Sequence, residues 1–283
     1  MMPSENFLLI EAALFGLVIG SFLNVCIHRL PLQKSLGGRS FCPACAHKIP
    51  GYDNIPVLSF LVLRGRCRFC REPISLQYPL VEIIAGGLSV LTLLHVSYEL
   101  DRYFIWYLLF VAPLIVLSFI DLHHRILPDV ITLPGIAGGM GAILYLKFPF
   151  WKEGLVYSAT GIVVGGGTLF LLATLYTLIR KREGMGGGDI KLCGMLGAFL
   201  GWKGMVFIFL ISSVLAILYA VVSLIVPRTK NRSDEAGPMI IPYGPFLAMA
   251  ALIFYFYGLE ITSFYFSLIG IPSNPVFTPQ TPY

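Results

Sequence analysis

Charged residues are scarce in this sequence. Of its 283 residues, only 12% are Asp, Glu, Lys or Arg, whereas 57% are hydrophobic and the mean hydropathy is +0.80. A typical soluble domain carries about 25% charged residues, so the composition excludes an ordinary soluble protein. It predicts instead an all-α protein that crosses a membrane several times.

The first apolar run has no Lys or Arg ahead of it and carries Glu5 and Glu11 instead. A cleaved signal peptide needs a basic start and a small-residue cleavage site, and neither is clear here. We therefore predict that residues 5–27 remain in the protein as its first transmembrane segment.

Nucleotide-binding loops are missing as well. The run from Gly184 to Lys191 does not fit the phosphate loop, because Leu192 follows Lys191 where Ser or Thr is required. It does not fit the dinucleotide fingerprint either, because Lys191 stands in place of the third glycine. The sequence alone therefore indicates no nucleotide-type cofactor.

About eight transmembrane helices are predicted. A span needs roughly 20 apolar residues, and residues 190–201 are too short for one at about 1.5 Å per residue. The alternative is therefore seven spans plus a re-entrant piece. The apolar segments are 5–27, 77–98, 103–120, 130–148, 154–179, 190–201, 205–226 and 243–270.

The basic residues give the orientation. The loops after the first, third, fifth and seventh spans hold 16 of the 20 Lys and Arg residues, which assigns these loops to the cytosol. Both termini then lie outside. The net charge of +5 is spread over several short loops. We therefore expect the protein to lie in a lipid bilayer and not to bind nucleic acid.

This pattern divides the chain into four parts. Residues 1–28 are the first transmembrane helix, 29–76 a cytosolic insert, 77–271 a membrane helical bundle, and 272–283 a Pro-rich tail that we expect to be disordered. The loop 228–237 is expected to be mobile. No internal repeat or low-complexity segment is apparent.

The insert holds two Cys-x-x-Cys pairs separated by 21 residues, a spacing typical of one tetrahedral zinc site. A metal would stabilise an insert too small to bury much core. Four thiolates would fill the coordination shell and make the zinc structural. His47 could replace one thiolate, and two redox or disulfide pairs are the alternative. The predicted ligands are Cys42, Cys45, Cys67 and Cys70.

Two acidic residues stand at the ends of apolar segments. Asp189 follows Gly186, Gly187 and Gly188, and Asp121 follows the segment that ends at Ile120. An acidic residue at a membrane is costly and usually functional. Asp189 alone could simply cap the next helix, and Asp121 could be a solvated carboxylate. Together they predict a carboxylate pair at the cytosolic face.

Six motifs in the same order make the chain similar to the type IV prepilin leader peptidases, aspartic membrane proteases with N-methyltransferase activity. They are Gly20-Ser21-Phe22-Leu23-Asn24-Val25, the two cysteine pairs, Tyr78-Pro79-Leu80-Val81-Glu82, the stretch from Asp121 to Asp129, the glycines before Asp189, and Ile241-Pro242-Tyr243-Gly244-Pro245-Phe246. The resemblance covers nearly the whole chain.

The resemblance implies specific roles for several residues. Asp121 and Asp189 would be the catalytic pair, supported by Gly186, Gly187, Gly188, Lys191 and Asp129. It implies S-adenosylmethionine as methyl donor and makes Glu82 a candidate to bind it. Glu82 could equally make a buried hydrogen bond between helices.

The activity so implied is cleavage of the leader from type IV prepilins or type II secretion pseudopilins, followed by methylation of the new N-terminus. The enzyme would lie in the bacterial inner membrane with a periplasmic N- and C-terminus and an active site at the cytosolic face. Two alternatives stay open at this point. One is a transporter or channel whose carboxylates carry protons or metal ions, and the other is a protease without methyltransferase activity.

Overall fold

The computed structural model describes residues 5–181, 186–225 and 242–269, and these are almost entirely helical. In these ranges the extended pairing is limited to two isolated bridges, Phe41 with Lys48 and Arg66 with Pro73. The predicted mobile loop 228–237 and tail 272–283 lie outside the described residues. The all-α prediction is confirmed.

The chain forms two compact units, Met1–Ile120 and Asp121–Tyr283. This division runs through the predicted bundle of residues 77–271, because residues 77–120 belong with the first helix and the insert. We describe each unit by itself.

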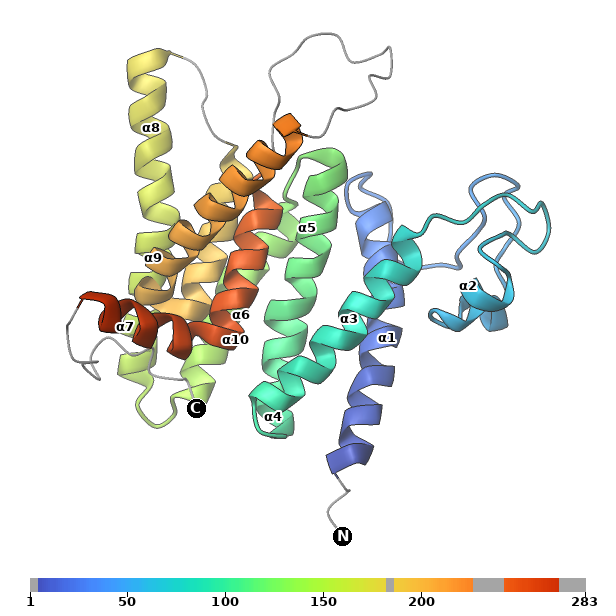
Figure 1. The fold of residues 1–283 in the computed structure, drawn as a ribbon, viewed down its shortest axis with the longest axis horizontal. Coiled ribbons are helices and arrows are strands. Elements are labelled where there is room, and N and C mark those ends of the chain that lie inside the picture. The colour runs from blue at the N-terminus through green and yellow to red at the C-terminus, as the bar shows by residue number, and fades with distance from the viewer. Residues whose placement is uncertain (1–4, 182–185, 226–241, 270–283) are drawn as a thin grey trace. The chain divides into compact units, whose positions relative to one another are not determined.

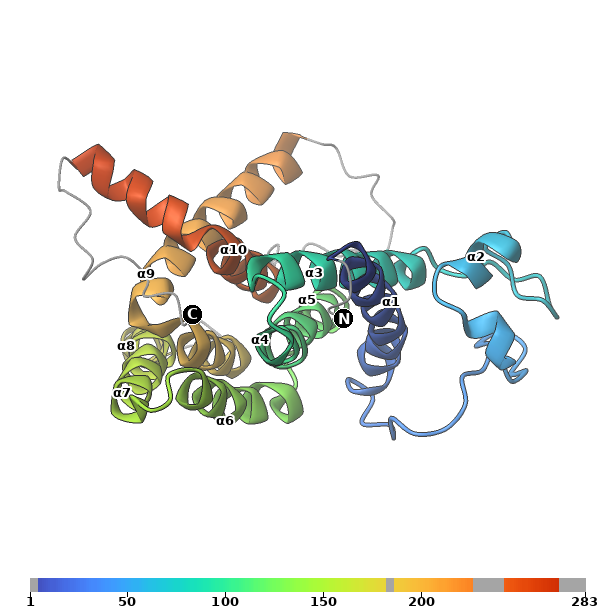
Figure 2. The same cartoon turned by 90° about the horizontal axis from the view of Figure 1, so that it is seen from below.

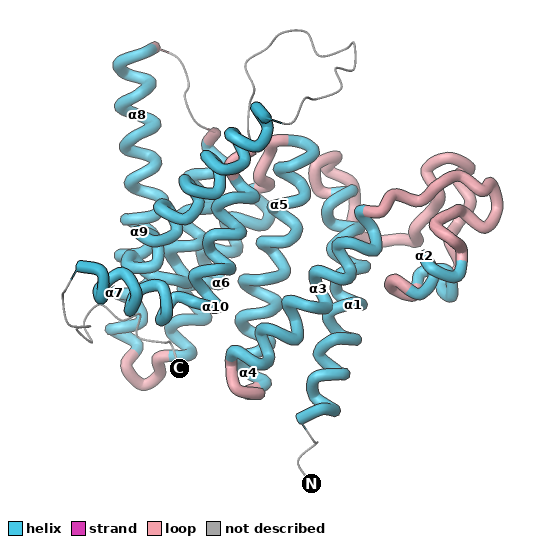
Figure 3. The backbone as a smooth tube through the Cα atoms, viewed as in Figure 1, coloured by secondary structure: helices cyan, strands magenta, loops and turns pink. Residues whose placement is uncertain are grey.

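The first unit consists of membrane helices and a loop-rich insert, which Figure 3 shows mostly as loop. The insert carries two short helical turns. The elements of this unit are α1 (Glu5–Arg29), η1 (Gly51–Asn54), α2 (Leu58–Val62), α3 (Gln77–His95), α4 (Leu100–Trp106), the π-helical turn η2 (Tyr107–Val111) and the start of α5 (Ala112–His124).

Helices α1 and α3 are antiparallel and pack closely through small residues. A side chain added at Gly20 would come within 2.7 Å of the Glu82 Cα atom, and one at Gly16 within 2.5 Å of the Ser89 Cβ atom. The Ser89 hydroxyl donates a hydrogen bond of 2.6 Å to the carbonyl oxygen of Ala12. Glycine in α1 therefore lets the backbone of α3 approach closely at Glu82.

The second unit is a bundle in which α6 and α7 lie along the first part of α9 in both views (Figures 1 and 2). Its glycines allow this contact, because Gly161 of α7 meets the carbonyl oxygen of Gly197 in α9. The elements are the end of α5, α6 (Asp129–Leu146), α7 (Trp151–Ile162), the π-helical turn η3 (Val163–Gly167), α8 (Thr168–Arg180), α9 (Gly187–Ile225) and α10 (Gly244–Ile269).

Helix α9 breaks at Gly201, whose φ of 66° and ψ of 176° are not helical. A side chain there would meet the Tyr157 ring at 2.6 Å, and an L-residue rarely adopts this φ. The chain reverses at the break, since both ends of α9 lie at the same end of the bundle in Figure 1.

Ring contacts show that the arm of α9 after Gly201 runs antiparallel to α10. Phe207, just after the break, stacks on Phe254, whereas Tyr219, further along the same arm, contacts Phe246 near the start of α10. Counting α9 once, seven of the described helices are long and apolar enough to cross a membrane. The predicted number of eight is approximate because it counts the two arms of α9 separately.

Candidate active site and metal centre

Asp121 lies in the last turn of α5 and is buried, with 6% of its surface exposed. Its Oδ2 accepts a hydrogen bond of 3.0 Å from the backbone N–H of Gly244. The first N–H groups of a helix have no partner within the helix, and Gly244 opens α10. The start of α10 therefore holds the Asp121 carboxylate in place.

Gly244 is a site residue that sequence reasoning did not identify. A Cβ atom at this position would come within 2.7 Å of Asp121 Oδ2, so a larger residue would displace the carboxylate. The available signal was the sequence Gly244-Pro245, in which proline occupies an early helical position after a small residue.

Asp189 is the third residue of α9 and is half-buried. Its backbone N–H donates to the carbonyl oxygen of Gly186 at 3.2 Å. The Asp189 carboxylate lies near enough to Asp121 for the two to interact electrostatically. The structure thus brings together the two carboxylates that the sequence singled out, one from a helix end and one from a helix start.

The glycines before Asp189 differ in what surrounds them. A Cβ atom at Gly188 would come within 2.9 Å of the Leu127 Cβ atom, whereas Gly187 has open space around it. A side chain at Gly186 would lie 3.9 Å from an Asp189 oxygen. Gly188 therefore lets the connection between α5 and α6 contact the start of α9.

Lys191 and Asp129 form an ion pair between α9 and α6. The Lys191 Nζ atom lies 2.7 Å from each carboxylate oxygen of Asp129, which is the first residue of α6. Both side chains are partly exposed. The pair joins the start of α9 to the first turn of α6, and Lys191 follows Asp189 by two residues in the chain.

The four predicted zinc ligands come together in the insert. Their sulfur atoms all lie within 4.8 Å of one another, and the Sγ atoms of Cys42 and Cys70 are 3.8 Å apart. Tetrahedral zinc with bonds of about 2.3 Å requires a sulfur–sulfur distance of about 3.8 Å. All four thiols are free of disulfides. The arrangement could hold one metal ion.

The two cysteine pairs are copies of one loop, so the expectation of no internal repeat was wrong. Residues 40–49 and 65–74 make the same backbone contacts at an offset of 25 positions. The signal was an Ile four positions after each second cysteine. In the first loop, the backbone N–H groups of Cys42, Ala46 and Ile49 donate to the carbonyl oxygens of His47, Cys42 and Ser40, respectively. In the second loop, those of Cys67, Arg71 and Ile74 donate in the same order to the carbonyl oxygens of Glu72, Cys67 and Gly65.

Backbone contacts in the insert favour the thiolate form of one of the four cysteines, Cys67. Backbone N–H groups of Cys70 and Phe69 lower the pKa of Cys67 to about 7, and the thiolate is the metal-binding form. The rings of His47 and Phe69 pack against each other in a tilted arrangement with centroids 3.6 Å apart, and this contact joins the two loops. Within the described residues, the group close enough to hold a metal consists of the four cysteines and does not include His47.

A second ion pair joins two parts of the insert. Arg68 donates two hydrogen bonds of 2.6 and 2.7 Å to Asp53 and lies 5.4 Å above the Tyr52 ring. The guanidinium group keeps the pKa of the Asp53 carboxyl below its usual range. This pair ties η1 to the second cysteine loop.

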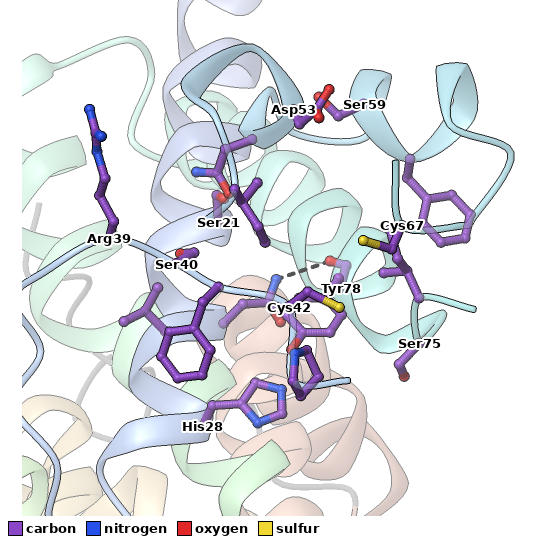
Figure 4. A pocket seen from close by; sticks show the side chains of 18 of the residues that line it. Ser21, His28, Arg39, Ser40, Cys42, Asp53, Ser59, Cys67, Ser75 and Tyr78 are labelled. Atoms are coloured by element: carbon purple, nitrogen blue, oxygen red, sulfur yellow. Dashed lines mark hydrogen bonds between the residues drawn. The ribbon is translucent and has the colours of Figure 1, made fainter. Parts of the chain in front are cut away.

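Glu82 is among the residues that line a pocket of about 800 Å³ formed by the insert and helices α1 and α3. Figure 4 shows other side chains of this pocket, among them Ser21, Asp53 and Tyr78. The Oε2 atom of Glu82 accepts a hydrogen bond of 2.7 Å from the Val57 N–H, and Glu82 also bonds to the Ser21 hydroxyl. Glu82 therefore contacts both the insert and the neighbouring helix, in addition to lining a cavity.

Two family models match the chain. The model described as Bacterial Peptidase A24 N-terminal domain covers residues 14–96, and the model of the type IV leader peptidase family covers residues 108–221. The first match lies within the first structural unit. The second match lies in the second unit except for residues 108–120, which belong to the first unit.

Several curated proteins named prepilin leader peptidase/N-methyltransferase are similar to this chain. The one from Aeromonas hydrophila is 37% identical over 277 residues, covering 89% of this chain and 91% of that protein. The one from Pseudomonas putida is 36% identical, and the match covers 92% of this chain and 94% of that protein. The one from Myxococcus xanthus is 39% identical, and the match covers 78% of this chain and 66% of that protein. No solved structure gives a significant match.

Proposed function

The chain belongs to the type IV leader peptidase family, and we propose that it cleaves the leader of type IV prepilins or type II secretion pseudopilins and then methylates the new N-terminus. The observation that carries the proposal is that Asp121, in the last turn of α5, and Asp189, at the start of α9, lie near enough to interact electrostatically. Proteins that the chain resembles over most of its length carry both activities in their names.

The carboxylate pair supplies the chemistry of peptide hydrolysis. One carboxylate takes a proton from the attacking water, and the other, protonated, polarises the scissile carbonyl and protonates the leaving amine. The Gly244 amide fixes the position of Asp121, and Gly188 lets Leu127 pack beside Asp189. Asp129 and Lys191 support the site through their ion pair.

The site lies at the cytosolic face of the bacterial inner membrane in this proposal, and both termini are periplasmic. The support is the concentration of basic residues in alternate loops. Carboxylates at helix ends, rather than at the middle of the membrane, favour a protease over the transporter considered above.

Two further groups belong to the proposal. Cys42, Cys45, Cys67 and Cys70 bind one structural zinc ion, for which their sulfur geometry is suited. S-adenosylmethionine supplies the methyl group, and Glu82 contributes to its binding. We assign cleavage to the second unit and methylation to the first.

Mass spectrometry of a co-expressed prepilin tests this function. The wild-type protein should yield a pilin that is cut and one methyl group heavier. Asp121→Asn and Asp189→Asn should leave the leader in place, whereas Asp101→Asn, an exposed carboxylate on α4, should behave as wild type. Removal of the leader by both active-site variants would overturn the assignment.

A further inference from the structure

The short helix α2 of the insert has its polar and apolar sides reversed relative to a helix of a soluble domain. Leu58, Leu61 and Val62 are 53%, 64% and 68% exposed, and residues at positions i, i+3 and i+4 share one face of a helix. The buried residue of α2 is the polar Ser59. The apolar face of α2 is therefore directed away from the rest of the insert.

Hydrogen bonds on the opposite side hold α2 in this orientation. The Ser59 hydroxyl donates a bond of 3.0 Å to the carbonyl oxygen of Tyr52 in η1, and it accepts one of 3.0 Å from the backbone N–H of Ile55. Rotating α2 so that its leucines face inward would break both bonds and bury a hydroxyl without partners. The exposed apolar face is therefore a property of the folded insert.

The contact between α2 and α3 sets the level of this face along α3. The backbone N–H of Val57, the residue directly before α2, donates a hydrogen bond of 2.7 Å to Glu82. Glu82 is the sixth residue of α3 and lies about 7.5 Å from its first residue along the helix axis. Helix α2 therefore lies beside the first turns of α3 rather than beyond its start, as Figure 1 also shows.

Helix α3 is just long enough to cross a membrane. Its 19 residues measure about 29 Å, and the hydrocarbon core of a bilayer is about 30 Å thick. The start of α3 must then lie at the edge of that core, and α2 lies where the headgroups meet the acyl chains. Amphipathic helices on a membrane surface bury their apolar face about 5–10 Å deep at this boundary.

Basic residues follow α2 directly in the chain. Arg64, Arg66 and Arg71 are exposed, and within the described residues none of these three forms an ion pair, whereas Arg68 is paired with Asp53. The whole insert holds eight Lys and Arg residues and only two Asp and Glu residues. Exposed leucines beside exposed arginines match acyl chains beside anionic headgroups.

We propose that α2 anchors the insert to the membrane surface, with Leu58, Leu61 and Val62 inserted among the acyl chains and with Arg64 and Arg66 at the phosphate groups of anionic lipids. Lipid is favoured over a protein partner because the face lies at the level of the bilayer edge and is flanked by cations. This interaction is separate from cleavage and methylation and requires only that α3 spans the membrane.

Photo-crosslinking of the full-length protein in lipid nanodiscs tests the proposal. The discs contain equal amounts of phosphatidylglycerol, which is anionic, and phosphatidylcholine, which is not, and p-benzoylphenylalanine replaces Leu61. After irradiation, mass spectrometry should find lipid adducts on the peptide that contains residue 61. Phosphatidylglycerol should be favoured about fivefold, which is the effect of one basic residue near an anionic surface.

Substitutions on the apolar face test its insertion. Leu58→Glu combined with Val62→Glu, with the same probe at residue 61, should reduce the yield of all lipid adducts more than about tenfold, because two side chains lose their apolar surroundings. Leu36→Glu is the matched control, since Leu36 is an exposed apolar residue of the insert outside α2. A midpoint of thermal unfolding close to that of the wild type shows that each variant is folded.

Substitutions of the arginines test the choice of lipid. Arg64→Gln combined with Arg66→Gln should keep the adducts at residue 61 but bring the yields of the two lipids close to equality. Arg102→Gln is the control, because Arg102 lies in α4, beyond the other end of α3 along the chain. This control should keep the preference of the wild type for phosphatidylglycerol.

Three results would contradict the proposal. Adducts of residue 61 with protein in place of lipid, whether with a second copy, the second unit or a co-expressed prepilin, would overturn it and assign the apolar face to that protein. A folded wild-type protein without lipid adducts at residue 61 would overturn it as well. Equal yields of the two lipids in the wild type would overturn the assignment of an anionic partner to the arginines.

Discussion

The two units hold their functional carboxylates in different ways. Asp121 and Asp189 lie at helix ends, and Asp121 is held by the backbone at the start of another membrane helix. Glu82 lies within a helix, and one of its hydrogen bonds comes from Val57 in the insert. In the proposed function the protease site is therefore built by the bundle alone, whereas the methyl-transfer site to which we assign Glu82 depends on the insert. The two activities should consequently fail under different changes.

The largest expected effect is the loss of cleavage in Asp121→Asn and Asp189→Asn. Each removes one of the two groups that move protons, a role that contributes about 10²–10⁴-fold to rate. Both variants should still methylate a pilin that has already been cut, because the first unit is untouched. Cleavage and methylation would be measured separately on purified protein. Loss of both activities in a variant that keeps its metal would indicate one merged site.

The opposite separation is expected when the metal is lost. Cys45→Ser should lower the zinc content from about one per chain, unfold the insert and remove methylation, while cleavage stays within a few-fold of wild type. Elemental analysis and the two activity assays check this result. Cys26→Ser is the matched control, because Cys26 lies in α1 outside the cluster. A metal-free protein that methylates normally would contradict the role of the insert.

Gly244→Ala tests how closely α10 holds Asp121. The added methyl group would lie 2.7 Å from Asp121 Oδ2, so the carboxylate or the helix must move. A misplacement of about 1 Å can cost about 10²-fold in rate. We expect kcat for cleavage to fall by about this factor, with methylation unchanged. Gly138→Ala, where a methyl group meets open space, should cleave normally.

The smallest effect is expected at the ion pair between Lys191 and Asp129. Both groups are partly exposed, and such pairs contribute up to about 1 kcal/mol, so Asp129→Asn should reduce cleavage by roughly fivefold. The exchanged double variant, Asp129→Lys with Lys191→Asp, should recover most of the loss. Recovery shows that the pair positions α9. A loss of cleavage as complete as that of Asp121→Asn, without recovery, would make Asp129 a catalytic group.

The helical fold, the cysteine cluster and the proximity of Asp121 and Asp189 could be predicted from the sequence, because apolar length, metal-ligand spacing and the cost of a membrane carboxylate are local signals. The contact of Gly244 with Asp121 could not, since it joins residues 123 positions apart. The pairing of Lys191 with Asp129 was missed for the same reason. These contacts depend on how helices pack, which residue pattern alone does not determine.

The helix break at Gly201 shows a different limit. Composition indicated a short apolar segment, but the reversal of direction depends on a positive φ and on the Tyr157 ring beside it. The repeated loops of the insert were visible in the sequence in principle. Their likeness lies in backbone hydrogen bonds and in only three shared residues, so it is easily overlooked among differing side chains.

The arm of α9 before Gly201 has a consequence for the bilayer itself. Residues 187–200 measure about 21 Å as a helix, whereas the hydrocarbon core of a membrane is about 30 Å thick. Local thinning of the bilayer is one way in which such a hydrophobic mismatch is accommodated. Asp189 stands at the head of this short arm. We therefore expect the lipid to form a shallow depression beside this arm, which would bring bulk water close to Asp189, the carboxylate to which we assign the activation of water.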